Sequence, residues 1–268
     1  MNSSSTKTQA DRGSSGIAAT TRRLTGAAPR VSLGDIVAER LREAILDDEF
    51  KPGEFIREAE VADSMAVSRG PVRDALILLE REGLVRISRN RGARVVDLTV
   101  TELGEVYSLR SILEELAVRL AIRRADDADI AALEEALEAM RQGVKSRPTA
   151  VQAAKLDVAF HDAIFRAAHH DRLMASWENI RMQVHLVVRR RNTADAEWRR
   201  LWRAPSVGGH KEILDLVKQG NENAAADLLR SHIATSFERV VDSMASAPSD
   251  GAPAHDEIKA IADSFLLS

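Results

Sequence analysis

Four side chains in the C-terminal half of the chain have the types and spacing of a metal-ligand set. Asp157 and His161, in the stretch LDVAFHDAIF, are four residues apart and therefore project from one face of a helix. His210 and His232 lie on two predicted helices, ten residues before Gly220 and twelve residues after it. With about 1.5 Å of rise per residue, the two helices bring these histidines to nearly the same height. Three imidazoles and one carboxylate could bind Zn²⁺, Ni²⁺ or Mn²⁺ and leave coordination positions for water or an anion.

A second group, made of arginines, has the chemistry of a DNA contact. In SRGPVRDAL, Arg69 and Arg73 are four residues apart in the first turns of a predicted helix that Ser68 precedes. Arginine can bind guanine through two hydrogen bonds and can also hold phosphate, and a helix N-terminus adds amides that favour phosphate oxygens. Further arginines surround the glycine of a later polar turn: Arg89, Arg91 and Arg94, next to Gly92. A run of charges is usually a solvated surface, so the hypothesis depends on where the whole set lies in the fold.

The elements around these arginines predict a winged helix-turn-helix over residues 31–98. Two short runs rich in β-branched residues, 84–87 and 93–96, flank the polar turn, which is typical of a β-hairpin. In a winged helix the third helix enters the major groove with its N-terminal residues nearest the bases, so Arg69 and Arg73 would face DNA. The apolar periodicity and turn signals indicate three helices, at about residues 33–45, 58–65 and 69–82.

The remainder of the chain is predicted to be helical, so the fold class is mainly α. Residues 101–245 are expected to form an all-α antiparallel bundle, whose first helix would be capped by Thr101. Residues 1–30 have a composition typical of a disordered tail, which organellar transit peptides share, and residues 246–268 comprise a linker and a short amphipathic segment. The other expected helices span about 126–144, 149–168, 171–192, 209–218 and 221–245.

Composition limits the chemistry further. The 268 residues are 44% hydrophobic and 29% charged, which is ordinary for a globular protein with a real core. A net charge of −3 means that any nucleic-acid surface must be local. The absence of cysteine excludes disulfides, thiolate metal ligands and cysteine nucleophiles. No stretch approaches the roughly 20 apolar residues of a membrane span.

Residues 33–98 resemble the DNA-binding domain of the GntR family of bacterial transcription regulators. The resemblance is carried by AERLREAILDDEFKPGEFI, VSRGPVRDALILLEREGLV and NRGARV. Many members have a DNA-contacting basic residue just after the glutamate of the second helix, where this chain has Ala59, and Arg57 could supply a contact instead. The resemblance implies DNA contacts from the helix start and the wing: Ser68, Arg69, Arg73, Arg89, Arg91 and Gly92.

The C-terminal domain resembles the FCD effector-binding domain of the FadR subfamily, in which many members bind a metal through an aspartate and three histidines. Taken singly, each histidine here is more often an ordinary core or surface residue. The resemblance favours the full set, because the family's ligands occur in the same order: Asp157, His161, His210 and His232.

The same resemblance implies an effector site. Family members often have an arginine on the first helix of this domain that holds an effector carboxylate, and SLRSILEEL places Arg110 there. An alternative role for Arg110 is an intrahelical ion pair with Glu114, worth a few tenths of a kcal/mol. His185 is a further candidate to face the effector cavity. Organic acids, sugar acids or amino acids are the implied effector class.

These features predict a ligand-responsive DNA-binding transcription regulator and not an enzyme. The resemblance implies a cytoplasmic repressor that binds a near-palindromic operator as a homodimer. Two alternatives remain. A metal-dependent hydrolytic enzyme could use the Asp/His₃ site to activate water, although no general base has motif-level support. A helical interaction module with a vestigial DNA-binding head would not bind an operator.

Overall fold

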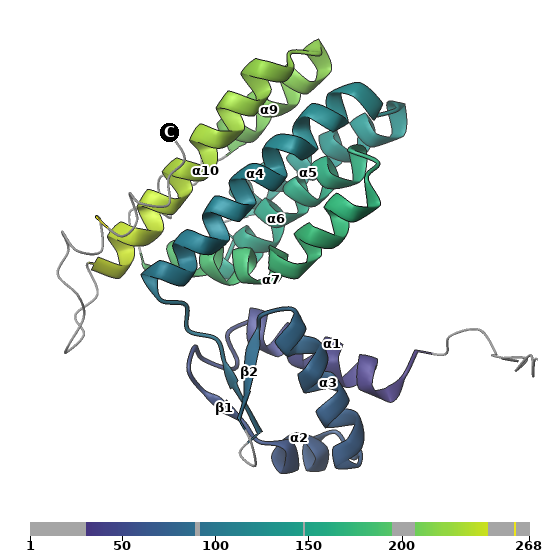
Figure 1. The fold of residues 1–268 in the computed structure, drawn as a ribbon, viewed down its shortest axis with the longest axis vertical. Coiled ribbons are helices and arrows are strands. Elements are labelled where there is room, and N and C mark those ends of the chain that lie inside the picture. Colours follow the sequence, from purple (N-terminus) through teal and green to yellow (C-terminus); the bar gives the residue numbers. More distant parts are fainter. Residues whose placement is uncertain (1–30, 89–91, 147, 195–206, 246–259, 261–268) are drawn as a thin grey trace, which may run out of the picture. The chain divides into compact units, whose positions relative to one another are not determined.

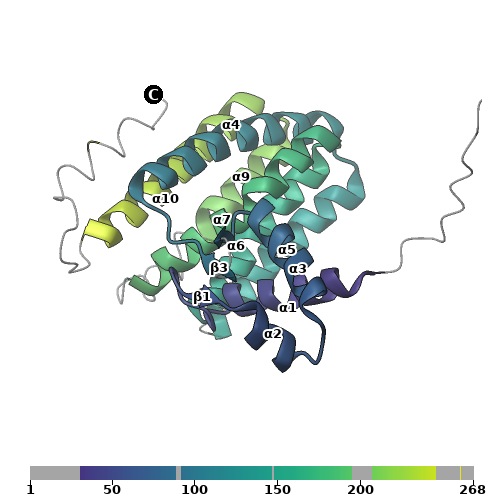
Figure 2. The same ribbon diagram turned by 60° about the horizontal axis from the view of Figure 1, so that its bottom comes forward.

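The winged helix-turn-helix is present in the structure, a computed structural model that describes residues 31–88, 92–146, 148–194, 207–245 and 260. Helices α1 and α3 pack against each other because their apolar stripes face inward, with Val37 and Ile45 of α1 and Leu76 of α3 almost completely buried. Figures 1 and 2 show these helices with α2 and the small sheet. The elements are α1 (Leu33–Leu46), β1 (Phe55–Ile56), α2 (Glu58–Ser64), α3 (Arg69–Arg81), β2 (Val85–Ser88) and β3 (Gly92–Val95).

The sheet has one more strand than the predicted hairpin. The described strands are antiparallel in the order β1-β3-β2, so β3 is central, and Ile56 of β1 pairs with Ala93 of β3. Gly92 begins β3 with a φ of +88°, and a Cβ added there would lie 2.3 Å from the carbonyl oxygen of Ile56. Glycine at this position is therefore needed for the approach of β1, because it alone tolerates both the positive φ and the close contact.

The chain after the wing forms the predicted helical bundle. Helix α4 begins after Thr99, whose side chain and that of Glu102 form a reciprocal capping box, so the expected cap at Thr101 is wrong. The capping box of Thr149 and Gln152 starts α6 at the predicted position. The helices are α4 (Val100–Arg124), α5 (Asp127–Ser146), α6 (Ala150–Ala167), α7 (Asp171–Ala194), α9 (Val207–Gln219) and α10 (Glu222–Ala245).

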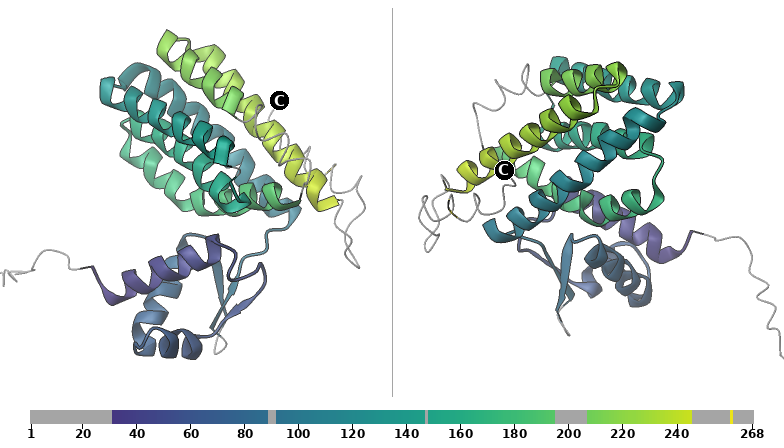
Figure 3. Two further views of the ribbon diagram at one scale, coloured as in Figure 1. Left: turned by 180° about the vertical axis from the view of Figure 1, so that it is seen from behind. Right: turned by 45° about the horizontal axis from the view of Figure 1, so that its top comes forward.

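Helices α4 and α10 lie side by side and run antiparallel, as Figures 1 and 3 show. Tyr107, near the start of α4, is hydrogen-bonded to Ser236 in the second half of α10, and Arg123 at the end of α4 binds Glu222 at the start of α10. Helices α5, α6, α7 and α9 complete the bundle, in which Phe165 of α6 stacks on the buried Trp177 of α7. None of the described helices is long and apolar enough to cross a membrane.

The buried apolar side chains form two main clusters, one in the winged helix and one in the bundle. Helix α7 contributes to both, because Met182 and Leu186 belong to the winged-helix cluster and Val184 and Val187 to the bundle cluster. The described residues from Leu33 onward belong to one compact unit. The expected tail at 1–30 lies outside the described residues, as does nearly all of the expected C-terminal segment at 246–268.

Candidate DNA-binding surface and metal centre

Three of the predicted DNA contacts, Ser68, Arg69 and Arg73, are exposed at the start of α3. Ser68 holds the N-cap position, although its side chain makes no capping hydrogen bond, and Arg69 and Arg73 follow one turn apart. The Arg73 side chain is 63% exposed, and its Nε donates to Glu58 Oε2 of α2 at 2.8 Å. Glu58 therefore restrains an arginine that stays accessible to a groove. Arg57, also exposed, precedes α2 as its N-cap residue and is paired with Glu60 of that helix.

The wing is only partly described. Arg89 and Arg91 lie outside the described residues, and Gly92 is held by the close approach of β1. Arg94 donates to the carbonyl oxygen of Gly53 and lies over the ring of Phe55, so its guanidinium has a role within the domain. DNA contact by this set stays a prediction.

The four predicted metal ligands come together inside the bundle. Asp157 and His161 lie one turn apart on α6, His210 lies in the first turns of α9, and His232 lies on α10. One ligand atom from each residue can be chosen so that all four atoms lie within 4.8 Å of one another. The ring centroids of His210 and His232 are 4.7 Å apart, and those of His161 and His210 are 5.3 Å apart. Gly209 lies beside His232, where a Cβ would be 3.3 Å from Nδ1.

The spacing of this cluster fits a shared ion. The separation between His161 Nε2 and Asp157 Oδ2 is 3.9 Å, and that between His210 Nε2 and Asp157 Oδ1 is 3.7 Å. Both are too long for hydrogen bonds. Two ligands at about 2.1 Å from one tetrahedral ion would be roughly 3.4 Å apart, so a small contraction would suffice for these two pairs, while ligand atoms as far apart as 4.8 Å would have to move more.

His232 is also in the protonation state that a metal requires. Part of the His232 residue reaches the surface, but its ring is enclosed by protein. Desolvation, followed by the neighbouring His210 and His161, lowers the pKa of His232 well below its usual value. The ring is therefore neutral at physiological pH and keeps a lone pair for coordination.

Arg110 and Glu114 of α4 form a fully buried ion pair next to these ligands. Arg110 Nε donates to Glu114 Oε1 at 2.6 Å, and Arg110 Nη2 lies 3.0 Å from His161 Nε2. The other carboxylate oxygen, Glu114 Oε2, lies 2.6 Å from His161 Nδ1. Burial opposes the charge of Glu114, yet Arg110 and His161 outweigh it and lower the pKa of this carboxyl. The two suggested roles of Arg110 are thus compatible, since it pairs with Glu114 and also reaches the ligand cluster.

His185 of α7 lies in a different setting. It lines a cleft of about 600 Å³ together with Lys155 and Arg181, and its Nε2 has no hydrogen-bond partner among the described residues. Burial, followed by the positive charges of Lys155, Arg189 and Arg181, lowers the pKa of His185 to about 4. A role for His185 in effector binding stays a prediction.

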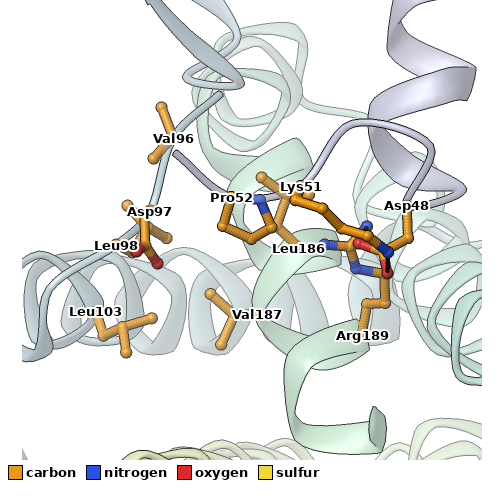
Figure 4. Close-up of a pocket in the computed structure, with 10 residues that line it drawn as sticks. All are labelled: Asp48, Lys51, Pro52, Val96, Asp97, Leu98, Leu103, Leu186, Val187 and Arg189. Atoms are coloured by element: carbon orange, nitrogen blue, oxygen red, sulfur yellow. Dashed lines mark hydrogen bonds and ion pairs between the residues drawn. The ribbon is translucent and has the colours of Figure 1, made fainter. Parts of the chain in front are cut away.

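A smaller cavity of about 360 Å³ lies where α7 meets the α1–β1 connection (Figure 4). On one side of this cavity, Asp48 forms ion pairs with Lys51 Nζ and Arg189 Nη1, at nitrogen–oxygen distances of 2.7 and 3.1 Å. Arg189 also donates to the carbonyl oxygen of Ile45 at 2.8 Å. The cations lining this cavity are therefore engaged in structural contacts. Its apolar lining includes Val96, Leu98, Leu103, Leu186 and Val187.

Comparison with known proteins matches residues 33–95 to the bacterial regulatory proteins of the gntR family and residues 105–235 to the FCD domain. The chain is 31% identical over 193 residues to the uncharacterised HTH-type transcriptional regulator YdhC of Bacillus subtilis (strain 168), covering 72% of this chain and 84% of that protein. This chain belongs to the GntR family. The winged helix and bundle of this GntR-family regulator also resemble the crystal structure of a GntR transcriptional regulator from Rhodococcus sp. RHA1, with 25% identity, a TM-score of 0.67 and coverage of 78% of this chain and 97% of that one.

A further relative of the regulator is the gluconate operon transcriptional repressor of Bacillus licheniformis, which is 33% identical over 152 residues, or 57% of this chain and 62% of that protein. The relatives are transcription regulators, a class of DNA-binding proteins without enzymatic activity, so the prediction of a DNA-binding regulator is confirmed. The alternative of a metal-dependent hydrolase finds no support among them.

The sequence does not indicate the contacts that Glu58 and Glu114 make in the structure. Glu58 restrains Arg73 from another helix, and no local pattern indicates such a contact. Sequence spacing predicts Glu114 as an intrahelical partner of Arg110, and in the structure its second oxygen also lies against His161. A signal for Glu114 does exist, because the buried face of α4 is interrupted by two charged residues at helical spacing among Tyr107, Arg110, Glu114, Ala117 and Ala121.

Proposed function

We propose that this GntR-family protein is a cytoplasmic repressor that releases its operator when a small carboxylate binds in the helical domain beside a divalent metal ion. The observation that carries the proposal is the enclosure of four potential ligands together with the buried guanidinium of Arg110. A relative of this chain is named a gluconate operon transcriptional repressor, and gluconate is a sugar acid.

The ligand set supports Zn²⁺, Ni²⁺ or Mn²⁺ held by Asp157, His161, His210 and His232. Imidazole nitrogens with one carboxylate oxygen suit these ions. A bound ion would supply positive charge and open coordination positions for carboxylate oxygens.

Arg110 supports an anionic effector. Burial opposes its charge, but Glu114, Tyr107 and Asp157 raise the pKa of Arg110, so the guanidinium stays charged. Its Nη1 is buried and has no hydrogen-bond partner among the described residues. An unsatisfied buried donor on a cation is costly, and a carboxylate oxygen would relieve that cost. We assign His185 a secondary contact from α7, where its neutral ring can donate or accept a hydrogen bond.

The DNA contacts that we propose come from α3 and the wing. Arg69 and Arg73 project from the exposed start of α3, where the helix terminus adds amides for a phosphate, and Ser68 would contribute its hydroxyl. Arg57, the N-cap residue of α2, would contact the phosphate backbone of the DNA. The wing would contribute Arg89, Arg91 and Gly92.

A homodimer is the proposed operator-binding form. Helix α4 has a second apolar stripe, outside the bundle core, in which Leu109, Ile112 and Leu116 are 43%, 55% and 44% exposed. Their spacing of three and four residues places them on one face, as in helices that pack against a partner helix. A second copy of α4 is the occupant we propose, because a two-fold axis through this stripe would present two α3 helices to a near-palindromic operator.

The decisive experiment combines metal analysis, melting and operator binding. We expect purified protein to contain about one divalent ion per chain, and chelation to lower its melting temperature. A carboxylate at 100 times its dissociation constant should stabilise the metal-loaded protein by about 2.7 kcal/mol and release operator DNA in a gel shift. Protein without stoichiometric metal, whose melting does not respond to added Zn²⁺ or Ni²⁺, would refute the ligand assignment.

A further inference from the structure

Glu114 connects the two halves of the proposed effector site. Its Oε1 accepts from Arg110 Nε, and its Oε2 lies 2.6 Å from His161 Nδ1. Neither atom has another hydrogen-bond partner among the described residues, and two lone pairs would repel at that distance, so we place a proton between the carboxylate and the imidazole. His161 therefore carries its proton on Nδ1 and directs the lone pair of Nε2 toward the ligand cluster. A carboxylate behind a ligating histidine commonly fixes the tautomer and orientation of the ring in this way.

The lone pair of His161 Nε2 is already in use. Arg110 Nη2 lies 3.0 Å from this nitrogen, and a guanidinium can only donate, so Nε2 is the acceptor. The same nitrogen is the one that faces Asp157 Oδ2 at 3.9 Å and would bind the ion. The metal and the arginine therefore compete for one lone pair.

We propose that metal binding and effector binding are coupled by an exchange at His161, with Glu114 as the positioning residue. The inference rests on the proposed metal and carboxylate site. When an ion takes the lone pair of Nε2, Arg110 Nη2 loses its acceptor, and the positive charge of the ion repels the guanidinium. Glu114 still holds Arg110 through Nε, and the planar guanidinium pivots as one unit about this hydrogen bond, which moves both terminal nitrogens away from His161. Nη1, without a partner among the described residues, and Nη2 then form a fork for one carboxylate.

The exchange predicts opposite effects of two neighbouring substitutions on metal affinity. Arg110→Gln removes the competitor, so Co²⁺ should bind about ten- to a hundredfold more tightly, the range expected for losing a hydrogen bond to a charged group. Glu114→Gln releases the tautomer and ring orientation of His161, so Co²⁺ should bind about ten- to a hundredfold more weakly. The measurement is a Co²⁺ titration of the full chain by visible absorption, in competition with a chelator.

Matched controls are available on the same helix. Glu115 and Arg119 form an i,i+4 ion pair on α4 outside the ligand cluster. Glu115→Gln and Arg119→Gln should leave the Co²⁺ affinity unchanged. If Arg110 had a purely structural role, Arg110→Gln would weaken Co²⁺ binding, so equal or weaker binding in that variant overturns the exchange.

A measurement on the unchanged protein covers the case in which a variant fails to fold. The ¹⁵N spectrum of histidine-labelled, metal-free protein should show His161 as the Nδ1–H tautomer, and the Nε2–H tautomer or an imidazolium would overturn the inference. Absence of Co²⁺ binding by both the wild type and Arg110→Gln would instead reject the proposed metal site itself. Binding by Arg110→Gln alone would support the competition.

Discussion

The buried Arg110–Glu114 pair should be far more important for folding than an ordinary pair on a helix surface. Its side chains are 1% and 0% exposed, and removing one partner leaves the other as an uncompensated buried charge. Arg110→Met or Glu114→Leu should each lower the free energy of unfolding of metal-free protein by about 3–5 kcal/mol. The double variant, which removes both charges, should cost less than either single variant.

The assay is urea denaturation followed by circular dichroism in the presence of a chelator, analysed as a double-mutant cycle. The comparison pair is Glu115 and Arg119, whose side chains are each 28% exposed and whose substitutions by Leu and Met should cost about 1 kcal/mol or less. Similar costs for the two pairs would refute the reasoning. So would additivity at the buried pair, because it would mean that neither charge depends on the other.

Three further predictions concern DNA binding, assembly and folding. In gel shifts, Arg73→Ala should reduce the discrimination between operator and random DNA by about 1–3 kcal/mol. The control variant Arg141→Ala on α5 should leave this discrimination unchanged, and equal operator affinity of the two variants would contradict the proposed contact. Ile112→Asp should convert the dimer to a folded monomer in sedimentation analysis, and an unchanged dimer would exclude this face of α4. Arg189→Met removes a charged donor from the Ile45 carbonyl, which still accepts from the Asp48 amide, and it also removes the ion pair with Asp48. The change should cost about 1–3 kcal/mol in urea denaturation, so an unchanged midpoint would show that these contacts contribute little.

The elements that the sequence predicted well are those with strong local signals. The two ends of α3 are set by backbone geometry alone. Pro71 lies in its first turn, and Gly83, just after its C-cap, has a φ of +70°. Asp157 and His161 could be placed on one helical face because the period of a helix is fixed. The helical hairpin around Gly220, which has a positive φ of +72°, predicts that His210 and His232 lie close together.

Features that depend on tertiary contacts were not predictable in the same way. Strand β1 has only two residues and exists because β3 offers it a partner edge. The apolar residues of α4 belong to two faces, and periodicity alone did not separate the buried Leu103 and Val106 from the exposed Ile112. Sequence spacing predicts the i,i+4 geometry of the Arg110–Glu114 pair but not its burial, and the burial changes how much the pair contributes to stability.

Helix α7 gives a physical route by which events in the bundle can reach the DNA-binding part. Met182 and Leu186 pack in the winged-helix cluster, while Val184 and Val187 of the same helix pack in the bundle cluster. Because protein cores are close-packed, a helix shared by two cores cannot shift in one without disturbing the other. An effector that favours a different position of α7 must therefore change the support of α1, whose last carbonyls accept hydrogen bonds from Arg189. We expect the amides at the end of α1 to change their hydrogen-exchange rates when the effector binds, and identical rates with and without it would rule out this route.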